Sequence, residues 1–368
     1  MLKTVDWVKS GNMERKAMMS LRDVLADVPF LTAGVPKFRA PSRRDAGVDC
    51  ILPVRQRNPA GRKLERKLLC QIRSTGQPRV AREACLELRE AAREDSRAYP
   101  VFLAPFISPD AAAICNRFGA GYMDMAGNCR LVFDTVFIKS EGRPNPAVEK
   151  RDLRSLFSPK AERVLRALVA SGKRDWRTQA LADAAGVSLG QVANVKKLLA
   201  DREWIEDARG GFRLRSFDEA VMPLLEEWPK AFRRSRGVAR EYYSLKPMAE
   251  LEASLTKAAE RRRQQLGFTA FSGGARMAPA VRFTKATAYV DGDPQALASD
   301  LGLKAVSSGA NLSLIEASDA GVFFGSRKID GAPVVSPVQI YLDLMAIKGR
   351  GEEAAQAILE QVIEPQWR

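Results

Sequence analysis

The central part of the chain takes its fold from one stretch of 58 residues, SPKAERVLRALVASGKRDWRTQALADAAGVSLGQVANVKKLLADREWIEDARGGFRLR, which runs from Ser158 to Arg215. Ser158 and Pro159 form a typical helix start, since Ser caps free backbone N–H groups and Pro fits the first helical position. The apolar residues that follow recur at the spacing of one helical face and predict a helix to about Ser171. That face is formed by Ala161, Val164, Leu165, Leu168 and Val169.

Two more helices and a hairpin are predicted in the same stretch. A short helix follows Thr178 and breaks at Gly186, and Ser188 caps the next helix, whose apolar residues again share one face. Residues 204–207 and 212–215 are predicted to be strands around a glycine turn, with apolar and Arg side chains alternating in the second strand. A helix, a helix-turn-helix and a hairpin in this order are typical of a winged helix-turn-helix.

The outward side of the third helix suits DNA recognition, because small and amide side chains near a helix start reach base edges in a major groove. Gln191 and Asn194 can each bond an adenine, and Lys197 suits a guanine or a phosphate. Arginines of the hairpin suit the DNA backbone. The expected DNA-binding residues are Arg177, Ser188, Gly190, Gln191, Asn194, Lys197, Arg209, Arg213 and Arg215. A small α+β module that binds protein is the alternative for this pattern.

The positive charge of the chain is concentrated in its first 216 residues. The net charge is +15 over 368 residues. Residues 1–150 hold 26 Lys and Arg against 17 Asp and Glu, residues 151–216 hold 14 against 8, and residues 217–368 hold 19 against 19. This asymmetry indicates a polyanionic partner for the first two parts, and double-stranded DNA is the polyanion that a helix-turn-helix favours.

Composition excludes several kinds of site. The sequence has no histidine, which excludes Ser-His-Asp and Cys-His catalysis and histidine-ligated zinc. Its five cysteines lie singly, without the spacing of a zinc site. Neither a complete phosphate-binding glycine motif nor a transmembrane run or signal-peptide core occurs. We therefore expect a cytoplasmic protein with reduced, mostly buried thiols, no cofactor and no bound metal.

The N-terminal part alternates strands and helices after a helical opening. The predicted strands cover residues 48–54, 67–74, 98–104, 121–125 and 130–138, and the predicted helices cover residues 77–93 and 108–118. In this order, and in Asp49 and the triplet Gln71-Ile72-Arg73, residues 30–140 resemble the PD-(D/E)XK nuclease-like fold. The resemblance implies an Asp at a strand end and an acidic-x-Lys triplet on the next strand, which hold a divalent metal and position the attacking water.

The triplet departs from that family. Gln71 brings no charge to a metal, and Arg73 keeps its proton near neutral pH. For Asp49 we favour an ion pair with arginines such as Arg73 over a catalytic role. We therefore expect no enzyme activity, with a metal-dependent nuclease that uses Asp49, Gln71 and Arg73 as the alternative. Binding through a basic face is the remaining use, and that face carries Arg43, Arg44, Arg55, Arg57, Arg62, Lys63, Arg66, Lys67, Arg73 and Arg79.

Three motifs mark the last part of the chain. They are Phe-Ser-Gly-Gly-Ala-Arg at 271–276, Ser-Pro-Val-Gln-Ile-Tyr-Leu-Asp-Leu at 336–344 and Gly-Arg-Gly-Glu-Glu-Ala-Ala at 349–355. With the helix-turn-helix, they resemble the AbiEi-type antitoxin family of transcriptional regulators over most of residues 158–365. The resemblance implies operator binding and repression of its own operon by the winged helix. It also implies that the C-terminal domain contributes to DNA binding and to antitoxic activity.

Two alternatives concern acidic residues next to glycines. Ser272-Gly273-Gly274 followed by Asp291-Gly292-Asp293 is loosely similar to a nucleotidyltransferase, but a tight turn and an Asp helix cap explain the two motifs more simply. Asp124 could be catalytic, but Gly127-Asn128 after it favours a turn between strands. Strands are also predicted at residues 285–290, 312–316 and 322–325.

The sequence thus predicts an α+β chain in four parts. They are an N-terminal helical segment at 1–29, a degenerate nuclease-like α/β domain at 30–150, a winged helix-turn-helix at 151–216 and an AbiEi-like C-terminal α/β domain at 217–368. The predicted function is a transcriptional regulator, a repressor of antitoxin type, that binds double-stranded DNA. A second copy, a toxin or another protein are further partners, and no membrane is involved. A DNA-binding scaffold of a plasmid, replication or defence complex is the alternative.

Overall fold

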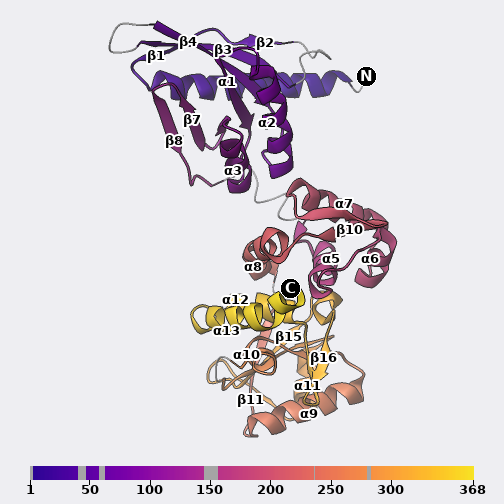
Figure 1. Ribbon diagram of the computed structural model, residues 1–368. Coiled ribbons are helices and arrows are strands. Elements are labelled where there is room, and N and C mark those ends of the chain that lie inside the picture. Colours follow the sequence, from indigo (N-terminus) through magenta and orange to yellow (C-terminus); the bar gives the residue numbers. More distant parts are fainter. Residues whose placement is uncertain (1–2, 40–46, 58–62, 145–155, 236, 280–282) are drawn as a thin grey trace. The chain divides into compact units, whose positions relative to one another are not determined.

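The computed structural model describes residues 3–39, 47–57, 63–144, 156–235, 237–279 and 283–368 (Figure 1). The chain forms two compact units: residues 1–149 form the first, and nearly all of the chain from residue 150 onward forms the second. Each unit has its own β-sheet and its own hydrophobic core. Within the described ranges, no helix is both long and apolar enough to cross a membrane.

The first unit is built on an eight-stranded sheet. Its strands are β1 (Leu31–Ala33), β2 (Lys37–Phe38), β3 (Cys50–Arg57), β4 (Lys63–Ile72), β5 (Ala98–Ala104), β6 (Gly121–Asp124), β7 (Cys129–Phe133) and β8 (Val136–Ser140), and its helices are α1 (Lys3–Ala26), α2 (Pro78–Ala92) and α3 (Pro109–Arg117). The order is β1-β3-β4-β5-β6-β7-β8, with β2 paired to β3. Because β4, β5 and β6 run parallel, they need crossovers, which α2 and α3 supply.

Helices cover both faces of this sheet. α1 buries Leu21 in a core with Val101 and Leu103 of β5, whereas α2 and α3 pack on Phe102 and Ala104 of the same strand. Alternate residues of a strand point to opposite faces of a sheet. α1 therefore lies on one face, and α2 and α3 lie on the other.

One strand prediction in this unit is wrong. Residues 130–138 form parts of two strands, β7 and β8, because a turn with Asp134 at φ 51° separates them. The turn predicted at Gly127-Asn128 is confirmed, with Gly127 at φ 92°. The Asp124 carboxylate accepts hydrogen bonds from the backbone N of Asn128 at 2.9 Å and of Ile107 at 3.2 Å, so it holds this turn.

The second unit begins with three helices and a hairpin, which we name the helix–hairpin module (residues 156–216). They are α5 (Pro159–Ala170), α6 (Thr178–Ala185), α7 (Leu189–Asp201), β9 (Ile205–Ala208) and β10 (Gly211–Leu214). All five lie where the sequence predicts them. Gly186 ends α6 in the left-handed conformation, with φ 61° and ψ 44°, which favours glycine.

A seven-stranded sheet follows in the same unit. Its strands are β11 (Ala239–Tyr243), β12 (Leu266–Phe268), β13 (Ala286–Val290), β14 (Lys304–Ala305), β15 (Leu312–Glu316), β16 (Arg327–Ile329) and β17 (Ala332–Val334), in the order β14-β11-β15-β13-β12-β17-β16. Its helices are α8 (Met222–Ser235), α9 (Met248–Arg262), α10 (Ala270–Gly274), α11 (Pro294–Asp300), α12 (Pro337–Met345) and α13 (Arg350–Ile358).

Two expectations for this part are corrected, and one is confirmed. Residues 320–323 form a 3₁₀ turn, so the strand predicted at 322–325 is wrong. The tight turn expected at Ser272-Gly273-Gly274 is also wrong, because both glycines lie in the short helix α10. There, a Cβ at Gly273 would stand 2.6 Å from the carbonyl oxygen of Phe268. The glycine therefore serves close packing. The helix cap is confirmed, since Asp293 accepts from the backbone N of Gln295 at 2.9 Å.

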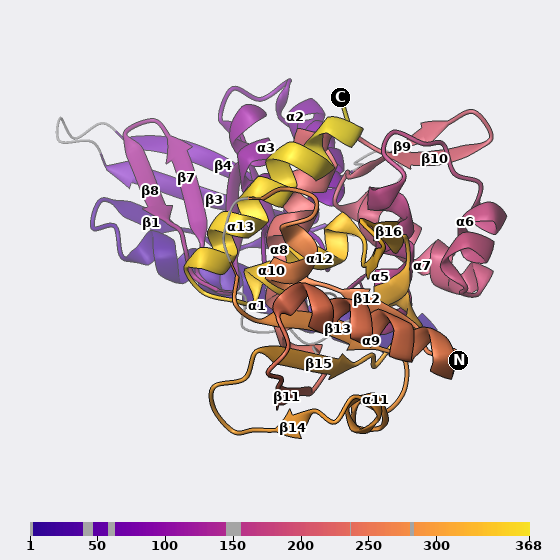
Figure 2. The ribbon, with the colours of Figure 1, turned by 90° about the horizontal axis from the view of Figure 1, so that it is seen from below.

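The helix–hairpin module and the second sheet share one hydrophobic core. α5 and α8 both pack on α12 (Figures 1 and 2), and the core includes Leu165, Trp228 and Leu342 from these three helices. Trp228 is fully buried. The two segments expected as separate domains, 151–216 and 217–368, thus meet inside a continuous core.

A chain of buried polar groups crosses this core. The guanidinium of Arg166 is 2% exposed; it donates to Gln339 Oε1 on α12 at 3.1 and 2.7 Å and pairs with Glu162 at 3.3 Å. The indole of Trp228 donates to the other oxygen of Glu162 at 3.0 Å. Gln339 donates to Asp343 at 3.2 Å. α5 is therefore tied to α8 and α12 by directional bonds as well as by apolar packing.

The pKa of Glu162 depends on the buried groups around it. Burial raises the pKa of Glu162, and the Arg166 charge and the Trp228 hydrogen bond act in the opposite direction. Asp343 accepts hydrogen bonds from the hydroxyl groups of Thr269 at 2.5 Å and Tyr289 at 2.8 Å. Removing one member of such a chain leaves its partner buried without compensation, which costs more than the pair contributes.

We expect Arg166→Met to lower the free energy of unfolding by about 3–5 kcal/mol, because it leaves the Glu162 carboxylate buried without its cation. Arg163→Met is the matched control: Arg163 lies on the same helix and pairs with Asp319 at 2.8 Å, but its side chain is 27% exposed. That variant should cost about 1 kcal/mol or less. Urea denaturation followed by tryptophan fluorescence measures both.

The pH dependence gives a second check on this variant. Because burial raises the pKa of Glu162, the stability difference between Arg166→Met and the wild type should be small below the ordinary pKa of a Glu, where the carboxyl is protonated in both states. It should grow as the pH rises through the raised pKa of the folded state. Equal losses for the two Arg→Met variants, with no dependence on pH, would contradict the role given to Arg166.

Candidate nucleic-acid interface

α7 presents a face of polar and small side chains to solvent. Ser188 caps the helix as predicted, because its Oγ accepts a hydrogen bond from the backbone N of Gln191 at 3.3 Å. Gln191 is half-buried, whereas Ser188, Gly190, Asn194 and Lys197 are exposed. The sequence has no acidic residue between Ser188 and Ala200. This face can therefore approach a polyanion without like-charge repulsion from its own helix.

Two further residues on this face were missed by the sequence analysis. Leu189 is 48% exposed, and Ala193 is exposed one turn later. Leu189, Ala193 and Lys197 are spaced by four residues, so they share one side of the helix. That spacing, counted back from Lys197, was the signal that could have identified both.

The β9–β10 hairpin is held close to the strand-like segment before α6. Trp176 and Phe212 exchange backbone hydrogen bonds of 2.7 and 3.0 Å. A Cβ at Gly211 would lie 2.0 Å from the carbonyl oxygen of Trp176, so this approach requires glycine. Phe212 and Leu214 are buried, as their alternation with arginines predicts.

Two of the three hairpin arginines already have acidic partners. Arg213 lies 2.7 Å from Glu206, its partner across the hairpin, and 3.4 Å from Asp175. Arg215 lies 3.9 Å from Glu219. The charge of Arg213 is therefore balanced by two carboxylates, and the charge of Arg215 is partly balanced.

Arg209, on the turn of the hairpin, and Arg177, which precedes α6, are the predicted DNA-binding arginines without an acidic partner among the described residues. Arg209 is exposed at the turn, next to Gly210. A Cβ at Gly210 would lie 3.5 Å from Nε of Arg177, so the Arg177 side chain lies beside the same turn. Within the described part of the chain, neither arginine forms an ion pair. The turn of the hairpin thus has an exposed arginine of its own and the side chain of Arg177 beside it.

In the first unit, the altered triplet and the candidate acid lie together. Asp49 precedes β3 and accepts hydrogen bonds from the backbone N of Ile72 at 2.6 Å and from Arg73 Nη1 at 3.3 Å. Gln71 is fully buried at the end of β4. Burial raises the pKa of Asp49, whereas the Ile72 N–H and the Arg73 charge act to lower it. The ion pair that we favoured for Asp49 is confirmed.

Glu87 of α2 is a fourth member that the sequence analysis did not identify. Arg73 Nη2 lies 3.2 Å from Glu87 Oε2, and Gln71 donates a hydrogen bond from Nε2 to the same oxygen. Only the packing of α2 on the sheet brings Glu87 to the triplet. α2 also carries Glu83 and Glu90, and no sequence signal separates Glu87 from them.

These residues do not fit a divalent metal. The guanidinium of Arg73 reaches both carboxylates, at 3.3 and 3.2 Å, and supplies the positive charge that a metal would bring. Gln71 Oε1 is buried without a hydrogen-bond partner among the described residues, but it is a neutral oxygen. Across those residues, no three His, Cys, Asp or Glu side chains are grouped to hold a metal ion. Both carboxylates of this cluster are thus already paired with Arg73.

Much of the basic face expected on the first unit is neutralised. The ion pairs are Arg55–Glu65, Arg66–Asp134, Lys67–Asp95, Arg73–Asp49 and Arg79–Glu83. Arg57 is exposed. Arg43, Arg44, Arg62 and the side chain of Lys63 lie outside the described residues. The described cations thus do not form a continuous surface of free positive charge.

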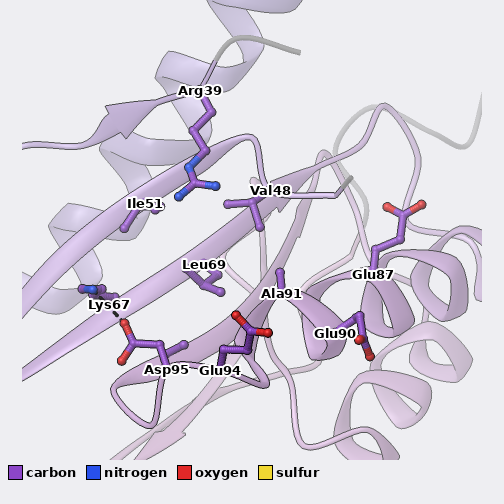
Figure 3. A pocket seen from close by; sticks show the side chains of 11 residues that line it. Arg39, Val48, Ile51, Lys67, Leu69, Glu87, Glu90, Ala91, Glu94 and Asp95 are labelled. Atoms are coloured by element: carbon purple, nitrogen blue, oxygen red, sulfur yellow. Dashed lines mark hydrogen bonds and ion pairs between the residues drawn. The ribbon is translucent and has the colours of Figure 1, made fainter. Parts of the chain in front are cut away.

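A pocket of about 540 Å³ lies between β3, β4 and α2 (Figure 3). Its acidic side chains, Glu87, Glu90, Glu94 and Asp95, outnumber its basic ones, Arg39 and Lys67. Figure 3 shows Lys67 and Asp95 paired at one end, at 2.7 Å. Its apolar lining includes Val48, Ile51 and Leu69. The acidic excess makes this pocket unsuited to nucleic-acid phosphates.

Comparison with known families adds one finding. Residues 220–364 match the family described as transcriptional regulator, AbiEi antitoxin, type IV TA system. This region contains all seven strands of the second sheet. The match supports the expected AbiEi resemblance in that region, and it does not extend to the helix–hairpin module or to the first unit. No curated protein and no solved structure matches the chain.

We expect the protein to leave double-stranded DNA intact in the presence of Mg²⁺ or Mn²⁺, because Arg73 supplies the charge of a metal at the altered triplet. The double variant Gln71→Glu/Arg73→Lys restores the acidic-x-Lys pattern. Mn²⁺ should raise its Tm and leave that of the wild type unchanged, since a ligand that binds only the folded state stabilises it.

Asp49→Ala in the double-variant background is the control for this experiment, because it removes a carboxylate without restoring Arg73. It should abolish the Mn²⁺ effect on Tm. DNA cleavage by the wild type that depends on Mg²⁺ and is lost in Asp49→Ala would show that the altered triplet is catalytic after all.

Proposed function

We propose that this protein is a sequence-specific double-stranded DNA-binding regulator, a repressor of antitoxin type, whose helix–hairpin module acts as a winged helix-turn-helix. One observation carries the proposal. The exposed face of α7 carries no acidic residue, and the buried face of the same helix shares a hydrophobic core with a region that matches a family of transcriptional regulators.

In this proposal, α7 is the recognition helix and enters a major groove with its N-terminal end. Asn194 is exposed and Gln191 is half-exposed, and both amides can form bidentate bonds to adenine N6 and N7. Lys197 lies two turns after Leu189, where it can reach a guanine or a phosphate. Ser188 and Gly190 at the start of the helix are small, so the backbone there can come close to the base edges.

The β9–β10 hairpin acts as the wing and contacts the DNA backbone through Arg209, with Arg177 beside its turn as a second phosphate contact. Phosphate contacts fix the orientation of a protein on the duplex and contribute salt-dependent affinity. Arg213 contributes less, because Glu206 and Asp175 already balance its charge. The wing thus positions α7, and α7 reads the sequence.

The matched region, residues 220–364, provides the regulatory partner surface in this proposal. The family it matches belongs to type IV toxin–antitoxin systems, so a toxin is the first partner to test. A second copy of the chain is another, because helix-turn-helix proteins commonly read paired half-sites. The first unit contributes binding, with no cleavage.

We expect Gln191→Ala/Asn194→Ala to weaken binding to the preferred DNA site by at least about tenfold, because each bidentate amide–adenine pair contributes about 1–3 kcal/mol of discrimination. The site is first selected from a random double-stranded library and then measured by gel shift against random competitor DNA. Binding to random DNA should change little, since neither residue is charged.

Gln179→Ala is the matched control for the double variant, because Gln179 is an exposed amide on α6, bonded to Asp183 at 2.8 Å. It should bind the selected site as the wild type does. Failure of the wild type to select any site would disprove sequence-specific binding. An unchanged affinity in the double variant would show that α7 does not read the site.

We expect Arg209→Ala to weaken binding to selected and random DNA alike, because the side chain contacts a phosphate. It should reduce the slope of log K against log salt concentration by about 1. Arg213→Ala should reduce the slope by much less, because Arg213 is paired with Glu206. Gel shifts across a salt series measure both, and equal slopes for the two variants would argue against a wing contact by Arg209.

A further inference from the structure

An exposed leucine opens the proposed recognition helix. Leu189 is the first residue of α7 and is 48% exposed. Of the large apolar side chains in the described part of the helix–hairpin module, Leu189 is the one that is exposed. The core positions of α7, Val192, Val195 and Leu199, are fully buried. The exposed part of Leu189 therefore takes no part in the packing of the module.

The surroundings of Leu189 allow a close approach by another molecule. Its neighbours Ser188 and Gly190 are exposed and small, and a Cβ built at Gly190 would meet only Ser188 Oγ, at 4.0 Å. Ala193 continues the apolar side one turn later, and Lys197 follows it. An apolar strip at the start of the helix thus runs toward a cation that suits a phosphate.

The major groove offers one apolar group to such a strip. The edges of the bases carry hydrogen-bond donors and acceptors, and thymine alone adds a methyl group, at C5. An aliphatic side chain can satisfy no donor or acceptor, so on a base edge its favourable partner is that methyl. Cytosine presents the amino group at the neighbouring position and has no methyl.

We propose that Leu189 is a specificity-determining residue that contacts the C5 methyl of a thymine, with Ala193 extending the same contact. This inference rests on the proposed function, in which α7 lies in the major groove. Together with the adenine contacts proposed for Gln191 and Asn194, this contact predicts a preferred DNA site that is rich in A·T pairs opposite the start of α7.

Replacing thymine by uracil tests the contact, because the two bases differ only in the methyl group. The selected DNA site is synthesised with each thymine changed to uracil in turn, and affinity is measured by gel shift. At one or two positions, the wild type should lose about three- to fivefold in affinity, which corresponds to one buried methyl-sized group. In Leu189→Ala, the same replacements should cost clearly less affinity, because the main partner of the methyl is gone and only Ala193 remains.

Leu245→Ala is the matched control, because Leu245 is 90% exposed in the second unit and lies outside the helix–hairpin module. It should respond to uracil as the wild type does. Both leucines are exposed, so neither substitution opens a core, and circular dichroism checks the fold of each variant.

The outcomes separate this inference from the proposed function. If the wild type selects no DNA site, the proposed function fails. If the wild type selects a site but no uracil replacement lowers its affinity, the proposed function stands and the leucine contact is overturned. The contact is also overturned if the loss on replacement is as large in Leu189→Ala as in the wild type.

Discussion

The buried guanidinium of Arg166 is the interaction on which the second unit depends. It is 2% exposed and reaches from α5 to Gln339 on α12, with Glu162 as its counter-ion. A guanidinium removed from water needs a partner for its charge and for its N–H groups. These partners come from two segments that are more than 170 residues apart, so the bonds form only when the helix–hairpin module and the second sheet are packed together.

That packing determines what the module can do. Because α5 and α7 share a core with α8 and α12, the face of α7 belongs to the same compact unit as the matched region. A rigid interface loses less conformational entropy when it binds, which leaves more of the contact energy as affinity. A partner that displaces α12 would also disturb Gln339, and through it α5. The matched region and the module are thus energetically linked by specific groups.

The sequence predicts the elements whose signals are local and misses those that tertiary contacts decide. Ser158-Pro159 and Ser336-Pro337 mark helix starts through their own chemistry, and both helices are present. The strands at 239–243, 327–329 and 332–334 lack the apolar run of a strand such as 312–316, and their neighbours in the sheet stabilise them. At the candidate site, Arg73 was placed near Asp49 from strand order, whereas Glu87 arrives only through the packing of α2. Leu189 was missed because exposed positions were judged by polarity alone.

The effect of the net charge also depends on the fold, because the fold decides which cations are ion-paired. The net charge of +15 does not say which of the 59 cations are ion-paired, and Arg66, Lys67 and Arg73 of the first unit and Arg213 of the hairpin each pair with carboxylates. An ion-paired arginine releases few counterions when DNA binds, because its field is already balanced. Salt-dependent affinity therefore depends on fewer cations than the composition suggests. In the proposed function, discrimination between DNA sites then comes from short-range contacts, for which α7 offers small, amide and apolar side chains.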